Sequence, residues 1–531
     1  MYKAIGCAAM ITWLVALAST LSSVQSSREV TLKVSLGRNP VQDLDKNFIG
    51  HTIDASIIIK REWREVGFKD PLLLRLMKPI TPAYIRFGGI YSDHTTFVKG
   101  PAPVTQQPRR RTKDPSRKRG SKKPGRTTTK RVPKPLPDHA YIGTPDIDRL
   151  LDFVKSTESR LLYCLNSHQR RNVTEEDNVG VWDPTNSLEL ITYVQSRGDA
   201  DLVDWSVGNE PHRRDNVTGR YIGRAVRTLR AELNRRQLDK ARIIAPDLSQ
   251  LNKFTLELLH TMANTAKSSL SAASIHQYYL DGRTATWLRM VSPQVLDGLT
   301  NRIITAQNTI AETSNPDLPL WLTETGSAFG GGAKSLSREY PAMISFADKL
   351  GVAAVNGVKH VMRQSLFGGS YRLLDNDDCY RPSPEYWITA LFRMLIGEAS
   401  VQVVRMQPIF EHLRVYAFQR RMKRNRTVTV LAINIHPQAA YTIRTETPRL
   451  CRADRKDYII SPDGSPSNAT QVRLNGELLK YHNYTLPKLI SQAKAQSGCE
   501  PVLLKPFRVA FLVYKVKPAN PKEDSAEGNS L

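Results

Sequence analysis

The chain has 531 residues, of which 40% are apolar and 8% aromatic, and a formal net charge of +26. A chain of this length and composition is globular, can bury a large core and exceeds a typical single domain, which excludes a small one-core module. The basic excess indicates an acidic partner.

The N-terminus is typical of a secretory signal peptide, which we assign to residues 1–27. Residues 4–21 are almost entirely apolar and are followed by small polar residues at 22–27. The alternative is a membrane anchor, but Thr12 and Ser19 interrupt the apolar stretch and strong flanking charge is lacking. No other stretch is long and apolar enough to span a bilayer, so we expect a secreted chain with no integral membrane segment after signal removal.

Secretion makes the cysteines and the Asn-X-Thr sequons informative. Cys451 and Cys499 flank one C-terminal segment and are the candidate disulfide. Cys164 lies within an apolar run and is expected to be a buried free thiol. The cysteines lack the short spacing of a metal site, so neither a metal nor another cofactor is expected. Five asparagines are candidate glycosylation sites: Asn172, Asn216, Asn425, Asn468 and Asn483.

Residues 99–137 form a basic stretch that is rich in Pro, Thr and Ser and nearly free of apolar residues. Between Lys99 and Lys134 there are 14 lysines and arginines against one acid, a local charge of +13 and half of the whole excess. This composition predicts disorder, and the signal peptide excludes a nuclear-localisation role. The clustered basic residues would be open to trypsin-like or proprotein-convertase-like proteases, so we expect an excised linker.

Eight apolar, strand-like runs predict a (β/α)8 TIM barrel in residues 45–98 and 138–398. Their starts lie mostly 30–50 residues apart, with helix-like stretches between them, for example 221–238 and 338–350. The one wide gap, between the second and third runs, contains the basic stretch. The runs are 47–53, 83–87, 160–165, 202–207, 241–245, 271–276, 320–323 and 358–363.

Residues 399–517 have the pattern of an antiparallel β-sandwich. Short alternating runs separated by turns occur at 401–406, 412–419, 427–435, 471–474 and 507–516. Another alternating run, at 29–36, precedes the barrel, and we expect the segment 28–44 to join the same sandwich. The polar tail, 518–531, is expected to be disordered.

Two glutamates end apolar runs of the predicted barrel. The fourth run leads into Gly208-Asn209-Glu210-Pro211, where the proline ends the strand, and the seventh leads into Thr323-Glu324-Thr325. Barrel enzymes carry their chemistry at the carboxyl ends of the strands. A salt bridge or a helix cap explains either glutamate alone, whereas the pair fits the two carboxyl groups of a retaining glycosidase.

Several further segments carry a family resemblance. They are Thr52-Ile53-Asp54-Ala55, Pro82-Ala83-Tyr84-Ile85-Arg86-Phe87-Gly88-Gly89, His276-Gln277-Tyr278-Tyr279-Leu280-Asp281-Gly282-Arg283-Thr284-Ala285-Thr286 and Val361-Met362-Arg363-Gln364. Together with the two glutamate motifs, these segments resemble the heparanases, secreted endo-β-glucuronidases of glycoside hydrolase family 79. The resemblance runs from about residue 29 to residue 516. It also implies a latent single chain with a linker at the basic stretch, whose excision leaves two associated subunits.

The resemblance implies that Glu210 is the acid/base and Glu324 the nucleophile. The acid/base must be protonated to release the leaving sugar, so we expect the pKa of Glu210 to be raised, partly by the charge of Glu324. Asn209 would bind the 2-position substituent of the sugar, and His276 and Tyr278 would position the nucleophile.

The family pattern also implies substrate contacts. A guanidinium can bind a carboxylate or sulfate bidentately, which favours Arg283 as a ligand, although a salt bridge at the barrel rim is the alternative. A structural role is likewise the alternative for His276. The full set of substrate-binding candidates is Asp54, Asn209, Gln250, His276, Tyr278, Arg283, Gly330, Gly331, Gln364, Gly369 and Tyr371. The chain departs from the pattern at Ile90-Tyr91, at His212-Arg213-Arg214 and at Asn252-Lys253, so sulfate recognition is expected to be rearranged.

These observations predict a retaining endo-β-glucuronidase that cleaves heparan sulfate after linker excision by an activating protease. A hyaluronidase on the same scaffold and a non-catalytic heparan-sulfate-binding protein are the alternatives. The expected partners are an acidic glycosaminoglycan and the cleaved N- and C-terminal chains of the protein itself as a heterodimer, and nucleic acid is not expected. The expected location is the extracellular matrix, with the lysosome as a second compartment.

Overall fold

The computed structural model describes residues 27–36, 40–59, 67–103, 140–168, 171–172, 180–213, 217–376, 379–421, 426–481 and 485–517. The predicted signal peptide, most of the predicted linker, the C-terminal tail and the sequons at Asn216, Asn425 and Asn483 lie outside these residues. Of the remaining sequons, Asn468 is exposed and Asn172 lies on the short strand β8 (Arg171–Asn172).

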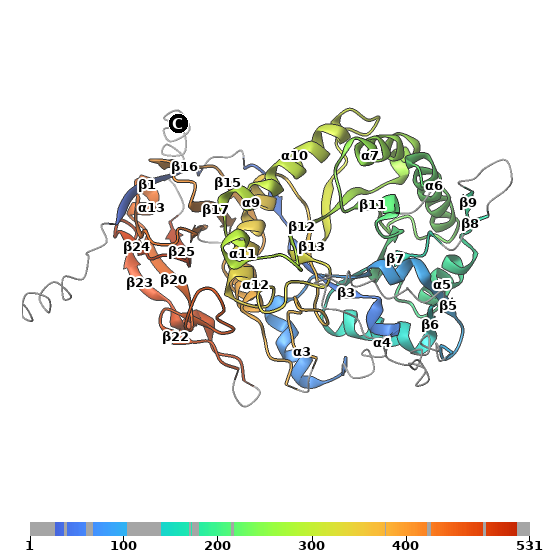
Figure 1. Ribbon diagram of the computed structural model, residues 1–531, viewed down its shortest axis with the longest axis horizontal. Coiled ribbons are helices and arrows are strands. Elements are labelled where there is room, and N and C mark those ends of the chain that lie inside the picture. Colours follow the sequence, from blue (N-terminus) through green and yellow to red (C-terminus); the bar gives the residue numbers. More distant parts are fainter. Residues whose placement is uncertain are drawn as a thin grey trace, which may run out of the picture.

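Eight parallel strands close into a barrel, which confirms the predicted fold (Figure 1). Each predicted run coincides with one barrel strand. Around the barrel the order is β3 (Ile49–Asp54), β4 (Tyr84–Gly88), β7 (Arg160–Leu165), β10 (Val203–Val207), β11 (Ile243–Leu248), β12 (Ala272–Asp281), β13 (Leu320–Phe329) and β14 (Val361–Arg363).

Helices connect successive strands and cover the outside of the barrel (Figure 1). The predicted helical stretches at 221–238 and 338–350 correspond to α6 and α11. Thr218 begins α6, because its side chain accepts a hydrogen bond from the backbone N–H of Tyr221. The main helices are α3 (Pro71–Met77), α4 (Thr144–Ser156), α5 (Thr185–Ser196), α6 (Gly219–Arg235), α7 (Lys253–Ala266), α10 (Gly298–Ala311), α11 (Tyr340–Val355) and α12 (Pro384–Leu395).

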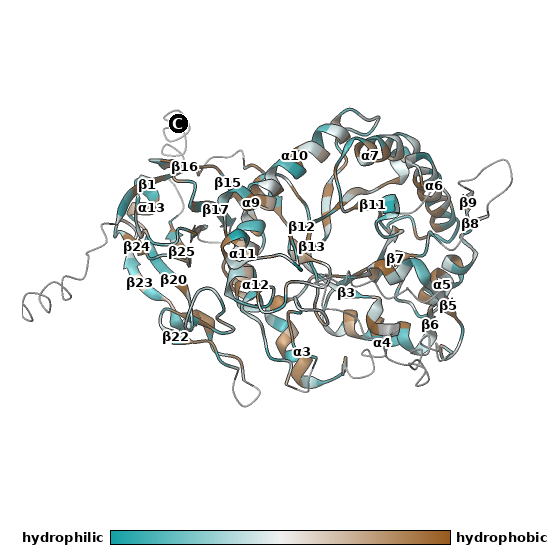
Figure 2. Ribbon diagram, viewed as in Figure 1, coloured by the Kyte–Doolittle hydropathy of each residue, from teal (hydrophilic) through white to brown (hydrophobic). Residues whose placement is uncertain are grey.

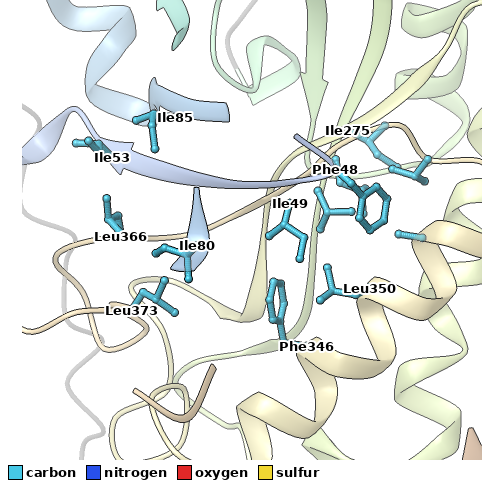
Figure 3. Close-up of a cluster of buried hydrophobic side chains, with 14 of the residues drawn as sticks. Phe48, Ile49, Ile53, Ile80, Ile85, Ile275, Phe346, Leu350, Leu366 and Leu373 are labelled. Atoms are coloured by element: carbon cyan, nitrogen blue, oxygen red, sulfur yellow. The ribbon is translucent and has the colours of Figure 1, made fainter. Parts of the chain in front are cut away.

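The barrel strands are apolar because both of their faces are buried. All five residues of β4 are buried, and so are all six of β11. The helices alternate hydrophobic and hydrophilic stretches along their length (Figure 2), as expected of helices that lie between a core and solvent. Figure 3 shows how Ile49 on β3 packs against Phe346 and Leu350 of α11.

The C-terminal region forms the predicted β-sandwich of two sheets. The smaller sheet has the order β16 (Val404–Gln407), β1 (Arg28–Val34), β19 (Tyr441–Thr445) and β24 (Val502–Leu504). The larger sheet contains β2 (Asp43–Leu44), β15 (Ala399–Gln402), β17 (Leu413–Arg421), β18 (Arg426–Asn434), β25 (Arg508–Val516), β20 (Asp454–Pro462), β21 (Val472–Leu474), β22 (Glu477–Leu478) and β23 (Lys494–Ser497). As predicted, the N-terminal strand joins the sandwich: β1 pairs with β16 and β19.

The expected single strand at 401–406 is wrong in one respect. It is two strands, because the chain leaves the larger sheet after β15 and enters the smaller sheet at β16, with Val403 50% exposed between them. The sequence analysis also missed β19 and β20. β19 alternates regularly but is only five residues long, and β20 begins with four charged residues, so neither gives a long apolar signal.

Three layers pack against one another, with the larger sheet between the smaller sheet and the barrel. Along β18, Val428 and Val430 face the smaller sheet, whereas Leu431 and Ile433 belong to the same core as the barrel. This alternation follows from the period of two in a strand. The barrel and the larger sheet therefore share one continuous apolar core, and the two sheets of the sandwich enclose a second one.

Two of the cysteine predictions are confirmed. Cys451 and Cys499 form a disulfide across 48 positions of sequence, and Cys164 is a buried free thiol. Among the residues that the structure describes, every helix is too short or too polar to cross a lipid bilayer.

Candidate active site

A cavity of about 570 Å³ opens at the carboxyl ends of the barrel strands. Both glutamates line it, together with two arginines and a set of aromatic and glycine residues from the surrounding loops. Its lining includes Asp54, Tyr91, Asn209, Glu210, Arg213, Ser249, Gln250, Tyr278, Arg302, Glu324, Phe329, Gly330, Gly331, Gln364, Phe367, Gly369 and Tyr371.

Glu210 lies on a tight turn directly after β10. Gly208 has φ of 75° and Glu210 has φ of 48°, so the chain passes twice through the left-handed region before Pro211. A non-glycine residue in this region is strained and is common at functional sites. The turn directs the carboxylate into the cavity, where the residue is only 7% exposed.

Glu324 lies inside β13, which extends to Phe329 and not only to residue 323 as predicted. The pairing of β12 with β13 shifts by one residue at Thr323, so that His276 comes to face Glu324. Such a bulge changes the direction of the side chain that follows it. The residue is 8% exposed, similar to Glu210.

The two carboxylates approach each other closely. One oxygen of Glu210, one oxygen of Glu324 and a ring nitrogen of His276 all lie within 4.8 Å of one another. Retaining glycosidases have carboxyl groups roughly 5–5.5 Å apart, whereas inverting enzymes leave room for a water between groups about 6.5–9.5 Å apart. The observed approach matches the retaining geometry.

Arg86 organises the floor of the site. Its Nη1 donates to Glu324 Oε2 at 2.9 Å, and its Nη2 donates to Asn209 Oδ1 at 2.8 Å and to Asp247 Oδ2 at 2.7 Å. The guanidinium is fully buried, and the charges of Asp247 and Glu324 raise its pKa even though burial opposes this. Arg86 therefore stays charged and keeps a positive group beside Glu324.

Asp247 balances this cluster of charges. Ser274 and Thr323 each donate a hydroxyl hydrogen bond of 2.6 Å to its Oδ1. Burial would raise the pKa of Asp247, but Arg86 and His276 lower it well below its usual value. The site contains a permanent buried anion in addition to the two glutamates.

His276 links the two glutamates. Its Nδ1 lies 2.9 Å from Glu210 Oε1 and 4.0 Å from Glu324 Oε2. Burial disfavours the charged ring, but Glu324 and Asp247 outweigh this and raise the pKa of His276 to about 9. The ring is therefore an imidazolium at neutral pH. It contacts Glu210 more closely than Glu324, the residue that it was expected to position.

The expected upward shift of the Glu210 pKa is wrong. Burial does raise this pKa, but the hydrogen bond and charge of His276 and the charge of Arg213 outweigh burial, and the net shift is downward. Arg213 Nε lies 2.6 Å from Glu210 Oε2. The sequence-based expectation considered the repulsion from Glu324 and omitted these two cations.

Tyr278 contacts the other side of Glu324, to which its hydroxyl donates a hydrogen bond of 2.8 Å. The ring of Tyr278 lies over Gly326, its register partner on β13, where an added Cβ would stand 3.0 Å from the ring. With Arg86 on one carboxylate oxygen and Tyr278 on the other, Glu324 is fixed in orientation.

Most of the predicted substrate-binding residues surround the cavity. Gln364 donates to Asp54 Oδ2 at 3.1 Å and to the hydroxyl of Tyr371 at 3.4 Å. Gly330 and Gly331 have φ of 78° and 90°, values that favour glycine and leave backbone groups facing the cavity. The cavity lining contains Asp54, Asn209, Gln250, Tyr278, Gly330, Gly331, Gln364, Gly369 and Tyr371.

Two predicted residues lie outside the lining. Arg283 has an 82% exposed side chain and pairs with Asp281 at 2.5 Å, which is the rim salt bridge weighed as its alternative. His276 lies beneath the surface of the cavity, fully buried behind Glu210.

Four functional residues escaped the sequence analysis: Arg86, Asp247, Arg213 and Arg302. Arg86 is the one charged residue in an otherwise apolar strand, and that contrast could have identified it. Arg213 was noted only as a departure from the family pattern. Arg302 lies on α10 and is partly buried, but nothing in the local sequence distinguishes it from exposed basic residues.

Glu210, His276 and Glu324 could together offer three ligand atoms to a metal ion. The guanidinium groups of Arg86 and Arg213 already contact one oxygen of each carboxylate. A further cation would be repelled by both groups, so the arrangement suits acid–base and nucleophilic chemistry better than metal binding.

Comparisons with known proteins agree with this geometry. Residues 143–351 match the N-terminal domain of glycosyl hydrolase family 79. The heparanase of Gallus gallus is 31% identical over 509 residues, which cover 90% of this chain and 93% of that protein. The hyaluronoglucuronidase of Hirudo nipponia is 27% identical over 468 residues, which cover 85% of this chain and 92% of that protein.

Among solved structures, the GH51 arabinofuranosidase from Xanthomonas axonopodis pv. citri superimposes with a TM-score of 0.62 at 14% sequence identity. The match covers 92% of this chain and all of that one. At this identity the likeness is one of fold, and it extends over both the barrel and the sandwich.

Proposed function

The chain belongs to glycosyl hydrolase family 79, and we propose that it is a retaining endo-β-glucuronidase that cleaves internal glucuronosyl linkages of heparan sulfate. The observation that carries this proposal is the approach of the Glu210 and Glu324 carboxylates, with ligand atoms within 4.8 Å. The relatives named heparanase and hyaluronoglucuronidase support a glycosaminoglycan as the substrate.

In the first step Glu324 attacks the anomeric carbon of the glucuronosyl unit. The bond from that carbon to the glycosidic oxygen breaks, and Glu210 transfers a proton to this oxygen. Hydrogen bonds from Arg86 and Tyr278 hold Glu324 in a fixed orientation before the attack. The result is an ester between Glu324 and the sugar.

In the second step a water replaces the leaving sugar. Glu210 removes a proton from the water, whose oxygen attacks the anomeric carbon and releases Glu324. The two inversions give net retention.

Proton delivery to Glu210 depends on its two cationic neighbours. Arg213 pairs with Glu210, and its side chain is 47% exposed. An anionic sugar that draws Arg213 away would raise the pKa of Glu210 toward the protonated form that the first step needs. The imidazolium of His276, in contact with Glu210 Oε1, is an adjacent proton source.

The residues around the cavity favour an acidic polysaccharide. Arg213 and Arg302 line it and can bind sulfate or carboxylate groups. An unsulfated polymer, hyaluronan, is the second candidate, because the relative from Hirudo nipponia carries that activity in its name. A non-catalytic binding role is disfavoured by the presence of both carboxylates in a reactive arrangement.

Activation by linker excision is part of the proposal. The strands β5 (Thr95–Val98) and β6 (Ala140–Gly143) flank the basic stretch and pair in parallel along their whole length. The N-terminal segment also contributes β1 to the sandwich and β3 and β4 to the barrel. These pairings would keep the two chains together as a heterodimer after a secreted, glycosylated precursor is cut.

Purified protein, before and after linker excision, should be incubated separately with heparan sulfate and with hyaluronan, and the products sized. We expect the form without the linker to shorten heparan sulfate much faster than the uncut form. Failure to shorten it would overturn the substrate assignment, and equal rates before and after excision would overturn latency. Glu324→Gln serves as the inactive control, and Glu312→Gln, an exposed glutamate at the end of α10, as the matched active one.

A further inference from the structure

A second cavity, of about 420 Å³, lies where the barrel meets the sandwich. The barrel supplies its lining from the loop before α11, the loop after β14 and the first turn of α12, and the sandwich supplies the segments beside β21 and β22. The lining residues are Arg338, Arg372, Asp375, Arg381, Pro382, Trp387, Thr470, Gln471, Leu479, Lys480 and Tyr481.

This cavity carries an excess of positive charge. Asp375 is the one acid in its lining, and it pairs with Arg338 at 2.9 Å, with Arg372 at 2.8 Å and with Arg381 at 3.3 Å. Lys480 contributes a further positive charge from the sandwich side. Arg381 also has other partners, but even without it the charged side chains of the lining sum to +2. Asp377 and Asp378 lie outside the described residues.

Arg338 has a buried donor that is unsatisfied: its Nε has no hydrogen-bond partner among the described residues. Burial and the neighbouring charges of Arg372 and Arg381 lower the pKa of Arg338, although Asp375 opposes this. A second anion in the cavity would relieve this repulsion.

The cavity also offers ring surfaces beside the cations. Trp387, Tyr481 and Pro382 line it, and Tyr481 is only partly buried. An arginine next to an aromatic ring suits a sugar that carries a carboxylate or sulfate, because the guanidinium binds the anion and the ring contacts the apolar face of the sugar.

One loop separates this cavity from the catalytic one. Gly368, Gly369 and Tyr371 line the catalytic cavity, and the next residue, Arg372, lines the second. Consecutive Cα atoms are ~3.8 Å apart, so the linings of the two cavities meet at this loop. Both cavities open beside loops that follow β13 and β14.

We propose that the second cavity is a subsite for an anionic sugar unit of the same polysaccharide that occupies the catalytic cavity. This proposal rests on the proposed function, because it takes a glycosaminoglycan as the ligand. A chain long enough to fill both cavities binds in two places at once, and the second contact is then intramolecular. The subsite sets a minimum length for tight binding and holds a long substrate during cleavage.

Binding can be measured without turnover in Glu324→Gln protein, by calorimetric titration with size-defined heparan sulfate oligosaccharides. A dodecasaccharide should bind at least about tenfold more tightly than a tetrasaccharide. Adding Lys480→Gln, or Arg372→Gln with Lys480→Gln, should remove most of this difference and leave tetrasaccharide affinity unchanged. Lys480 belongs to the sandwich and lies outside the loop shared by the two cavities, so its single substitution separates the subsite from a change within that loop.

The matched control is Lys505→Gln with Lys515→Gln, two exposed sandwich lysines whose loss gives the same change of net charge. This control should keep the length dependence. Unsulfated oligosaccharides of alternating glucuronate and N-acetylglucosamine identify the anion that the subsite binds. If the affinity difference between long and short chains persists with them, the subsite binds a carboxylate. If it is lost, the subsite binds a sulfate.

Equal affinity for short and long oligosaccharides, or a difference that survives Lys480→Gln and the double substitution, would overturn the subsite. Because binding is measured in an inactive variant, this result is independent of whether the active protein cleaves heparan sulfate. Cleavage without length dependence refutes the subsite alone, and length dependence without cleavage refutes the proposed function alone.

Discussion

The turn after β10 and the middle of β13 each present a buried glutamate, yet their surroundings differ in kind. Glu324 receives hydrogen bonds from Arg86 and Tyr278, two groups that keep their protons at physiological pH. Glu210 contacts His276, which titrates, and Arg213, whose side chain is 47% exposed and able to leave.

This difference fits the two chemical roles that we propose. A nucleophile benefits from fixed donors that keep it anionic and oriented, whereas an acid/base must change its protonation state twice in each cycle. The partners of Glu324 are suited to the first task, and those of Glu210 to the second. Substitutions of these partners therefore test the proposed difference between the two glutamates one contact at a time.

The largest effect is expected for Arg86→Met. Removal of the buried cation leaves Asp247 and Glu324 without their shared partner, which should lower the free energy of unfolding by about 3–5 kcal/mol and abolish cleavage. Denaturant unfolding and product sizing measure the two losses. Arg224→Met, on the exposed face of α6, should change stability by less than about 0.5 kcal/mol. If Arg86→Met is as stable as its control, the buried network does not hold the site together.

His276 should make stability depend on pH. Its folded-state pKa of about 9 lies above the usual value of 6.5, so its contribution is fully present below pH 6.5 and is lost as pH rises through 9. The free energy of unfolding should fall by about 3 kcal/mol over this range and lose that slope in His276→Gln. His260→Gln, on α7, should keep the slope, and an unchanged slope in His276→Gln would contradict the charged ring.

Tyr278→Phe should lower kcat about 10- to 100-fold with a smaller effect on KM. A hydrogen bond to a charged group contributes ~1.5–3 kcal/mol, and the hydroxyl of Tyr278 orients the attacking carboxylate. Steady-state kinetics on a defined oligosaccharide measure the change. The adjacent Tyr279→Phe removes a buried hydroxyl with no hydrogen-bond partner among the described residues and should leave kcat near that of the parent. Equal effects of the two substitutions would argue against a role for Tyr278 on Glu324.

Arg213→Gln should move the alkaline limb of the pH–rate profile of kcat/KM to higher pH. Arg213 lowers the pKa of Glu210, and the first step uses the protonated form, so loss of the cation extends activity upward in pH. Arg220→Gln, exposed on α6, provides the control. A limb that stays in place, or moves to lower pH, would show that Arg213 does not control the acid/base.

Much of the fold could be predicted because its periodicities are strong. Eight apolar runs marked eight barrel strands, and an alternating run at 29–36 marked β1 although its partners lie about 400 residues away in sequence. Strand ends were less accurate: β12 and β13 run several residues past their predicted ends. Those extensions pair with each other, and Leu280 and Ala328 from them pack in a small apolar cluster of their own with Met290. Their mixture of polar, aromatic and small residues gives no continuous apolar run that could have marked the strand ends.

The site was predictable in its residues and less so in its electrostatics. The motifs identified Glu210 and Glu324, and the cavity contains nine of the eleven proposed substrate contacts. The direction of the Glu210 pKa shift depended on Arg213 and His276, whose contacts with it no local motif reveals. Arg86 and Asp247 lie 161 positions apart, and only closure of the barrel brings them together.

The central claim is that Glu210 and Glu324 act by double displacement, and the anomeric configuration of the first product tests it most directly. Proton NMR recorded during cleavage of a defined heparan sulfate oligosaccharide distinguishes the new reducing-end glucuronate before it mutarotates. Retention gives the β-anomer first, with the α-anomer appearing later. Initial appearance of the α-anomer would mean inversion and would contradict the assignment of Glu324 as the nucleophile.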